Sequence, residues 1–572
     1  MAEVLLSPGV LARENDQSFL TNQPTQAGAA IVGPTVKGPV NIPTIVTSYS
    51  QYKNRYGAVV DSGSNEYTYF TSISAYNYFQ QGGNTLLVTR VASGSYTSAT
   101  SSLAQAVNTS ASFVLETLTE GTIMNSTSAE GASGDLLSGS VDNLRWEVAS
   151  PNTSSGTFSL LIRAGSDTTT SKTVLETWAD LSLDPNSSNY IEKIIGNQKQ
   201  TIVNDSGTHY LQLTGSYSNK SSLVRVKSVH KQLLNYFDNA GDAKAEYTPY
   251  IPVAGSGSFG TATGTPFNFQ GGGNANFYDQ IDSTYTQGLK SDNYTTAINL
   301  LANPDEFKYN LIVAPGLYKT DYSSQITSLV NNAQERGDNI AVVDMVKYGT
   351  SLLSVTDESS GIDSSYATTY WPWVMTIDPD LGKQCWVPAS TMIPGVYAFN
   401  DNATEPWFAP AGLNRGGLST VIRAERKLTN GNRDTLYAGK VNPIATFPNT
   451  GVVVFGQKTL QKKASALDRV NVRRLLIELK SYISQIADNL VFDQNSIATR
   501  NSFLGQVNPY LESVQQRQGL YAFKVVMDES NNPPDVIDRN QLVGQIYLQP
   551  TKTAEFIYLD FNVLPTGATF PA

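Results

Sequence analysis

The chain has 572 residues and is 40% hydrophobic, which supports packed cores in about three or four domains and excludes global disorder. Only 15% of the residues are charged and the net charge is −10, which argues against a generally basic nucleic-acid binder and leaves only a local basic patch open. One cysteine and two histidines allow no internal disulfide and little zinc chemistry, so no cofactor or metal is expected.

The N-terminal segment, residues 1–26, shows no period long enough for a helix or strand of its own. Short apolar runs flank a turn at Pro8 and Gly9. The segment is therefore either a frayed terminus or an arm that becomes ordered on a neighbouring molecule. It lacks the basic start of a signal peptide, and no stretch of the chain approaches about 18 apolar residues, so no membrane insertion is expected.

The pattern from Ala27 onward is that of a mixed α/β domain. It predicts strands over 29–33, 42–46 and 85–91, with a helix over 67–79. The composition then changes, because 93–133 is rich in Ser and Thr. Strands are expected over 144–148 and 158–162, and 254–275 is expected to be a glycine-rich loop. We therefore predict that 93–286 is an insertion of one or two β-rich modules.

Alternation of strands and helices resumes after the insertion. The pattern predicts a strand over 309–314, a helix over 322–336 and a strand over 339–344. This β-α-β spacing indicates a parallel sheet. The first mixed segment, 27–92, is expected to contribute to the same sheet, so that 27–92 and 287–460 together form one α/β core.

The region 461–552 is predicted to be a separate α+β domain. Its first helix carries apolar residues on one face, at Val472, Leu476, Leu479, Ile483, Ile486 and Leu490. A second helix is expected over 496–516, bent or broken near Pro509. Three strands follow. Tyr521, Phe523, Val525 and Met527 are expected to share one face of the first strand. The other two strands are marked by Leu542, Ile546 and Leu548, and by Ile557, Leu559, Phe561 and Val563.

Three patterns could carry chemistry, and each has a simpler interpretation. The G-x-G-x-x-G at 255–260 is not followed by a helix, so a loop is favoured over a dinucleotide site. Two Asp-Ser-Gly tripeptides could present Asp61 and Asp205 as an aspartic-peptidase dyad, but the tripeptide is also an ordinary turn. A Ser-His-Asp triad needs a histidine, and 287–460 contains none.

A local basic balance distinguishes 461–500 from the acidic chain. Arg469, Arg473 and Lys480 are spaced so that they lie near one stripe of the first C-terminal helix. The stripe is either a solvated helix face or a surface that docks on an acidic protein.

Long motifs in the second half of the chain resemble contractile-tail bacteriophage tail sheath proteins. The motifs are 407–416 (WFAPAGLNRG), 467–475 (LDRVNVRRL) and 531–540 (NNPPDVIDRN), and 6–10 (LSPGV) agrees with them. Together the resemblance covers about 1–92 and 287–572, and leaves 93–286 outside.

The resemblance implies a structural subunit and not an enzyme. Such subunits polymerise as hexameric rings around a tail tube and contract to drive the tube through the host envelope for genome ejection. It implies a subtilisin-like α/β core without catalytic residues. The implied partners are other copies, the tail tube protein, the baseplate and the tail terminator, but neither nucleic acid nor membrane. The implied location is the virion tail, and the host cytoplasm during assembly. A tailocin-like injection device is the alternative.

The resemblance also implies that arms at 1–26 and 553–572 are exchanged between neighbouring subunits. Exposed sheet edges attract such strands. The exchanged residues would be Val4, Leu5, Leu6, Val10, Leu11, Ile557, Leu559, Phe561 and Val563. The receiving sheet would carry Tyr521, Phe523, Val525, Leu542, Ile546 and Leu548. Because the resemblance places this domain innermost, Arg469, Arg473 and Lys480 are expected to face a locally acidic tube.

Overall fold

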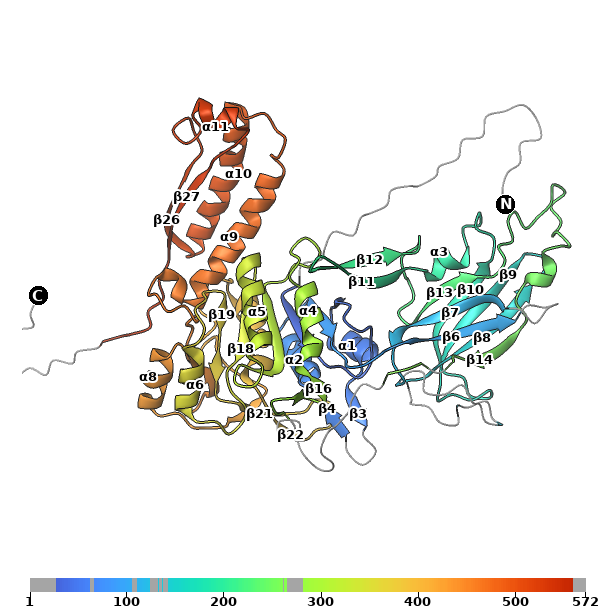
Figure 1. Ribbon diagram of the computed structural model, residues 1–572, viewed down its shortest axis with the longest axis horizontal. Helices are drawn as coiled ribbons and strands as arrows, with labels where there is room; N and C mark the ends of the chain where they lie inside the picture. Colours follow the sequence, from blue (N-terminus) through green and yellow to red (C-terminus); the bar gives the residue numbers. More distant parts are fainter. Residues whose placement is uncertain are drawn as a thin grey trace, which may run out of the picture.

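The computed structural model describes residues 27–558, apart from 62–65, 105–110, 124–131, 133–135, 137–141, 261 and 265–280. Figure 1 shows an α/β core at the centre, a strand-rich part on one side and a helical part that projects away from the core. Several of the predicted arm residues lie outside the described residues: Val4, Leu5, Leu6, Val10, Leu11, Leu559, Phe561 and Val563.

A six-stranded sheet forms the centre of the core. In spatial order the strands are β19 (Ala367–Thr368), β18 (Ile340–Asp344), β17 (Leu311–Tyr318), β1 (Ala29–Gly33), β5 (Leu86–Arg90) and β2 (Thr44–Val46). All neighbours pair in parallel except β2 with β5. Because β1 lies between β5 and β17, the segments before and after the insertion share one sheet, as predicted. The middle strands are buried throughout, which their continuous apolar runs require.

Helices cover this sheet and its extensions. They are α1 (Tyr49–Tyr56), α2 (Phe70–Gln80), α4 (Tyr294–Leu300), α5 (Ser323–Arg336), α6 (Leu352–Ser359), α7 (Ile393–Ala403) and α8 (Asn430–Ala438). The amide of Asn332 in α5 donates to the carbonyl of Ile298 in α4 at 2.8 Å, which joins these two helices. The predicted helix over 67–79 is present as α2, whereas α1 was not predicted, because its apolar residues are mainly tyrosines.

Smaller sheets complete the core. One has the order β20 (Tyr370–Trp371), β24 (Asn442–Phe447) and β25 (Gly451–Val454). Another has the order β22 (Gln384–Val387), β21 (Val374–Ile377) and β23 (Val421–Ala424). Two short hairpins are β3 (Val59–Asp61) with β4 (Glu66–Thr68), and β15 (Tyr285–Thr286) with β16 (Leu289–Lys290).

The insertion is a β-sandwich with its own hydrophobic core. One sheet has the order β10 (Val174–Ser182), β9 (Thr157–Ala164), β8 (Leu144–Asn152) and β14 (Gly255–Ser258). The other has the order β13 (Val224–Val229), β7 (Ala111–Glu120) and β6 (Ser98–Ala104). Phe113 and Phe158 stack between the sheets, with ring centroids 5.5 Å apart. One shared core means one module and not two.

The glycine-rich motif at 255–260 was expected to lie in a loop, and this expectation is wrong for its first four residues. They form β14, which pairs with β8 as an edge strand. Gly257 lies against the ring of Trp146, where a Cβ atom would come within 2.6 Å of the ring. Gly257 therefore allows close packing on a tryptophan, and the first four residues of the motif do not form a phosphate-binding turn.

Buried polar contacts join the insertion to the core. Arg90, at the end of β5, donates to the carbonyls of Gly38 at 2.6 Å and Glu120 at 3.0 Å. Lys37 pairs with Asp142 at 2.6 Å. A separate hairpin of the insertion, β11 (Lys199–Asp205) with β12 (Thr208–Thr214), lies beside α4. Ile281 packs in the core, so the insertion ends before it and earlier than the predicted residue 286.

The C-terminal domain is a helical hairpin with a small sheet. It contains α9 (Val470–Asp488), α10 (Ile497–Gln516), β26 (Leu520–Val526), α11 (Pro534–Asp538) and β27 (Gln545–Pro550). The predicted break at Pro509 is wrong, because α10 continues through it. Pro509 has no N–H for the carbonyl of Gly505, but both residues are exposed, so water can take the place of this donor.

Excision of the insertion tests whether the two parts fold independently. We expect a chain in which 93–280 is replaced by a flexible linker of about twelve residues to keep a cooperative thermal transition, because the insertion has its own core. The melting temperature should fall by only a few degrees, since the lost polar contacts are few. Circular dichroism measures both quantities. Loss of all secondary structure would contradict the division.

Candidate assembly site at the root of the C-terminal domain

The hairpin of β26 and β27 has one covered face and one exposed face. Phe523, Val525, Ile546 and Leu548 pack on the core of the C-terminal domain. A register shift after Leu520 buries that residue and leaves Tyr521 62% exposed. The prediction that Tyr521 shares the face of Phe523 is therefore wrong. Leu542 packs on the same core, although it precedes β27.

In the described part of the chain, no third strand pairs with either edge of this hairpin. Among the described residues, β26 and β27 pair only with each other. Each strand therefore keeps a row of backbone N–H and C=O groups without a strand partner. Such edges attract another chain unless they are covered.

The chain leaves the hairpin as an extended strap, which we define as residues 551–558. The N–H of Thr551 donates to the carbonyl of Gly519 at 3.1 Å. Beyond this point the strap forms no strand within the described part of the chain. Ile557, predicted to lie in a strand, is 76% exposed on the strap.

Glu555 fastens the strap to the body of the protein. Its carboxylate accepts from Arg469 Nε at 2.7 Å, Tyr437 OH at 2.8 Å and Gln457 Nε2 at 3.0 Å. Partial burial alone would raise the pKa of Glu555, but these hydrogen bonds outweigh it and the pKa lies below its usual range. The carboxylate is therefore charged at neutral pH and holds the strap at one place.

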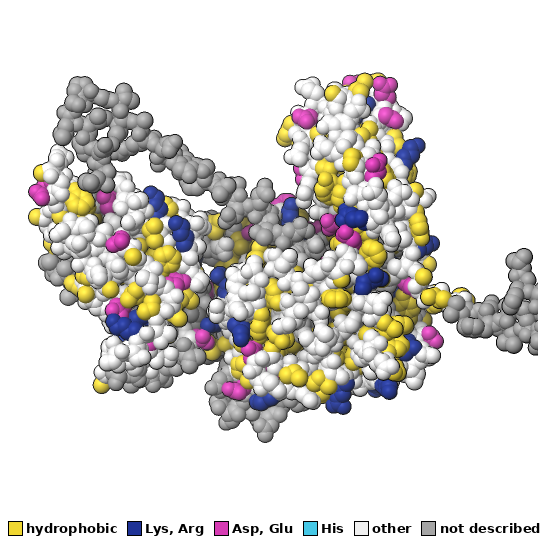
Figure 2. Space-filling view, turned by 180° about the vertical axis from the view of Figure 1, so that it is seen from behind, with side chains coloured by type: hydrophobic (Ala, Val, Ile, Leu, Met, Phe, Trp, Pro, Cys, Tyr) yellow, Lys and Arg dark blue, Asp and Glu magenta, His cyan; other side chains and the backbone are white. Residues whose placement is uncertain are grey.

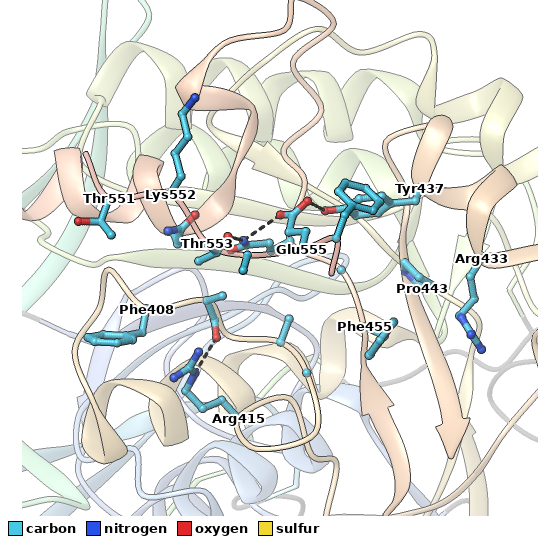
Figure 3. Close-up of a pocket in the computed structure, with 18 of the residues that line it drawn as sticks. Phe408, Arg415, Arg433, Tyr437, Pro443, Phe455, Thr551, Lys552, Thr553 and Glu555 are labelled. Atoms are coloured by element: carbon cyan, nitrogen blue, oxygen red, sulfur yellow. Dashed lines mark hydrogen bonds between the residues drawn. The ribbon is translucent and has the colours of Figure 1, made fainter. Parts of the chain in front are cut away.

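A pocket of about 730 Å³ lies beside the strap, and we call it the root pocket. Figure 3 shows the strap along one side of it, with Phe408, Arg415 and Phe455 on the other. The residues from the 407–416 motif line it, and Trp407 Nε1 donates to the carbonyl of Arg517 at 3.0 Å. The motif that carries the family resemblance thus joins the core to the C-terminal domain.

Two buried amides in the wall of the root pocket have unused acceptors. Gln457 and Asn471 are each 3% exposed. The NH₂ group of Gln457 donates hydrogen bonds to side chains of the strap. That of Asn471 donates to the carbonyl of Trp407 at 3.4 Å. Their oxygens, Gln457 Oε1 and Asn471 Oδ1, have no hydrogen-bond partner among the described residues. Buried acceptors of this kind need a donor, which water or a partner group can supply.

The predicted basic stripe does not exist as an exposed surface. Arg473 is only 4% exposed, with its guanidinium over the ring of Tyr366 at 4.0 Å. Arg469 precedes the first turn of α9 and pairs with Glu555 and Asp468. Lys480 alone of the three is exposed. The helical spacing was right, but the core covers the side of α9 that carries Arg473.

The neighbouring Arg474 is also buried, and it pairs with Asp401 at 2.5 Å. Asp401 belongs to α7, so this ion pair ties α9 to the core. The 531–540 motif is likewise structural. The side chain of Asn532 in this motif accepts from the N–H of Val543 and donates to its carbonyl, each at 2.8 Å.

The geometry offers no catalytic centre in the described residues. Asp61 and Asp205 lie in hairpins of separate sheets that are well apart in Figure 1, so the aspartic-peptidase hypothesis is wrong. Asp344 accepts from Ser390 Oγ at 2.5 Å, and burial raises the pKa of Asp344 to about 7. Both histidines of the chain lie in the insertion, so this pair has no histidine base.

Among the described residues, no group of three or more His, Cys, Asp or Glu side chains could hold a metal ion. No helix within those same residues is long and apolar enough to cross a membrane.

Two segments of the chain match models of known protein domains. Residues 287–460 match the phage tail sheath protein central domain, and residues 462–564 match the phage tail sheath C-terminal domain. These two ranges of the chain are thus similar to the central and C-terminal domains of phage tail sheath proteins.

The individual relatives that match this chain are likewise named tail sheath proteins. The chain is 32% identical over 360 residues to the tail sheath protein of Vibrio phage KVP40, covering 59% of this chain and 51% of the relative. It is 36% identical over 230 residues to that of Enterobacteria phage T4, covering 40% and 35%. The matches thus span about half, or less, of these relatives. A sheath tail protein from Listeria innocua shares the fold, with a TM-score of 0.50 at 10% identity over 92% of this chain and 96% of that one.

Removal of the Glu555 charge tests the fastening of the strap. We expect Glu555→Gln to speed amide hydrogen exchange in residues 551–556 by about ten-fold, because it weakens three hydrogen bonds at once. Lys552→Gln is the matched control, since Lys552 is exposed and forms no ion pair among the described residues.

Glu555 also makes the attachment of the strap depend on pH, and the direction of its pKa shift fixes the direction of this dependence. Because the folded-state pKa of Glu555 is depressed, its stabilisation is present above the ordinary carboxyl pKa and is lost as the pH falls through the folded value. Exchange in the wild-type strap, corrected for the intrinsic rate, should therefore rise between about pH 7 and about pH 3. A Glu555→Gln strap with the same pH profile would contradict this assignment.

Proposed function

We propose that this protein is the structural subunit of a contractile tail sheath. Its copies would stack as hexameric rings around a tail tube, and contraction of the stack would drive the tube through the host envelope for genome ejection. The two matched sheath domains support the class. The observation that carries the mechanism is the free edges of the β26–β27 hairpin, beside which the chain leaves as a strap.

Strand exchange between copies would satisfy those edges. The arms 1–26 and 553–572 of neighbouring subunits would add strands to β26 and β27. Each backbone hydrogen bond contributes about 0.5–1.5 kcal/mol, so one added strand is a moderate contact that repetition makes strong. Exposure of Phe556, Ile557 and Tyr558 supports a partner for the end of the strap.

Further features of the proposal follow the family. The parallel core would be subtilisin-like in arrangement, without catalytic residues. The partners would be other copies, the tail tube protein, the baseplate and the tail terminator. The protein would assemble in the host cytoplasm and become part of the virion tail. A tailocin-like device would have the same cylinder but no DNA-filled head, which distinguishes the two in electron micrographs.

The tube contact would fall to Lys480 of the three predicted residues. Arg469 and Arg473 are held within the subunit, whereas Lys480 is exposed and donates to Tyr366 OH at 3.3 Å. Surface charges of this kind contribute at most about 1 kcal/mol each, which suits a contact that contraction must release.

Truncation of the arms tests the proposal. We expect the full chain to form hollow cylinders in electron micrographs. Deletion of 1–18 or of 559–572 should leave soluble, folded monomers, because the hairpin edges then have no strand to receive. Sedimentation separates monomers from polymers, and circular dichroism checks folding. Cylinders of normal length from both truncated proteins would overturn the exchange of arms.

A further inference from the structure

The turn between α9 and α10 forms an exposed apolar tip at the free end of the C-terminal domain. We define the tip cluster as Val491, Phe492 and Ile497, all of which are exposed. Phe492 is fully exposed and has a backbone φ of +74°, an unfavourable conformation for a residue with a Cβ atom. Within the described residues, no contact of the side chain offsets this conformation. Strained and exposed residues of this kind are often found at functional sites.

The tip is also acidic. Asp488 and Asp493 flank Phe492, both are exposed, and neither forms an ion pair among the described residues. A partner surface for the tip should therefore combine an apolar hollow with unpaired cations. A solvated loop has no need of three large apolar side chains, which further favours a contact surface.

The root pocket has this complementary chemistry. Phe408 and Phe455 give it aromatic walls, and Arg415 and Arg433 stand over these rings at 5.2 and 5.6 Å from ring centroid to guanidinium carbon. Neither arginine has a carboxylate partner among the described residues, and Lys552 adds a third cation. Asp434 is the one lining acid among the described residues besides Glu555, and Glu555 is held by Arg469.

The pocket wall also contains hydrogen-bond acceptors that lack a donor among the described residues. Gln457 Oε1 and Asn471 Oδ1 are buried in its wall without a hydrogen-bond partner in the described part of the chain. Backbone N–H groups of an inserted turn would supply such donors. A volume of about 730 Å³ is in the range of sites that hold a ligand of many atoms.

A subunit cannot fill its own root pocket with its own tip. The pocket includes Asn471 in the first turn of α9, whereas the tip follows the last residue, Asp488. The 19-residue helix between them is about 28 Å long. Figure 1 shows this helix projecting straight away from the core, so tip and pocket lie at its opposite ends.

We propose that the tip cluster of one copy, with Asp488 and Asp493, docks into the root pocket of a second copy. The two surfaces differ, so the contact is head-to-tail and builds a ring or an open helix. Figure 2 shows the projecting domain and the core from behind, with several acidic side chains near the free end of this domain. The inference deepens the proposed sheath function by naming the faces through which copies meet.

Disulfide trapping in the full chain tests this contact directly. One protein carries Phe492→Cys and the other Ala554→Cys, at the strap wall of the pocket. We expect the mixture to give a crosslinked 1:1 species on non-reducing gels, and neither protein alone to do so. Burial raises the pKa of Cys385, the natural cysteine, to about 12, so its thiol stays protonated.

The matched control replaces the tip cysteine by Leu353→Cys, an apolar position on the core that is 66% exposed. Crosslinking of this control at the same rate, or no crosslink with Phe492→Cys, would overturn the inference. Cylinders without the tip crosslink would leave the proposed sheath function intact and reject only this contact. The crosslink without cylinders would support this contact and reject the proposed sheath function.

Charge exchange tests the complementarity. Asp493→Lys and Arg433→Glu should each slow the trapped crosslink by about ten-fold, as expected for a charged partner at the centre of a contact. Placing Asp493→Lys on the tip protein and Arg433→Glu on the pocket protein should recover most of the rate. Additive losses with no recovery would show that these two residues do not meet.

Discussion

The pairing of β1 with β17 is the constraint on which the rest of the molecule depends. These strands are separated by almost half of the sequence, yet β1 lies in the middle of the parallel sheet. The insertion must therefore leave and return to the same body, which it does through buried contacts at Arg90 and Lys37. The β-sandwich contributes no strand to the central sheet, so we expect it to fold on its own.

The sequence alone predicted the helices and strands that are marked by hydrophobic periodicity. The strand patterns around Ile31 and Val342 and the apolar face of α9 each predicted an element that the structure contains. Periodicity cannot tell what covers the other faces of a helix. Arg473 was expected on a solvated stripe and instead lies under Tyr366, since this contact depends on a residue more than one hundred positions away. The register shift that exposes Tyr521 likewise needs the paired strand to be seen.

The fastening of the strap was not predictable for a similar reason. Glu555 lies in a segment that the sequence marked only as an arm, and its three partners come from α8, from the residues after β25, and from the start of α9. The one signal available was the 467–475 motif, which contains Arg469. A motif shared with a family identifies residues under constraint, but the structure shows that most of this constraint is internal packing at the root of the C-terminal domain.

A contractile polymer needs contacts of two kinds, and both proposed contacts involve the C-terminal domain. The proposed strand exchange through the arms would persist while subunits rotate, because backbone pairing in an arm is independent of the orientation of the core. A tip seated in a pocket is different, because a rigid helix pair about 28 Å long makes its position depend strongly on the angle between subunits. A rotation of ten degrees would displace the tip by about 5 Å, more than the contact could follow. The tip contact would therefore exist in one packing of the subunits and break in the other, while the arms keep the polymer connected.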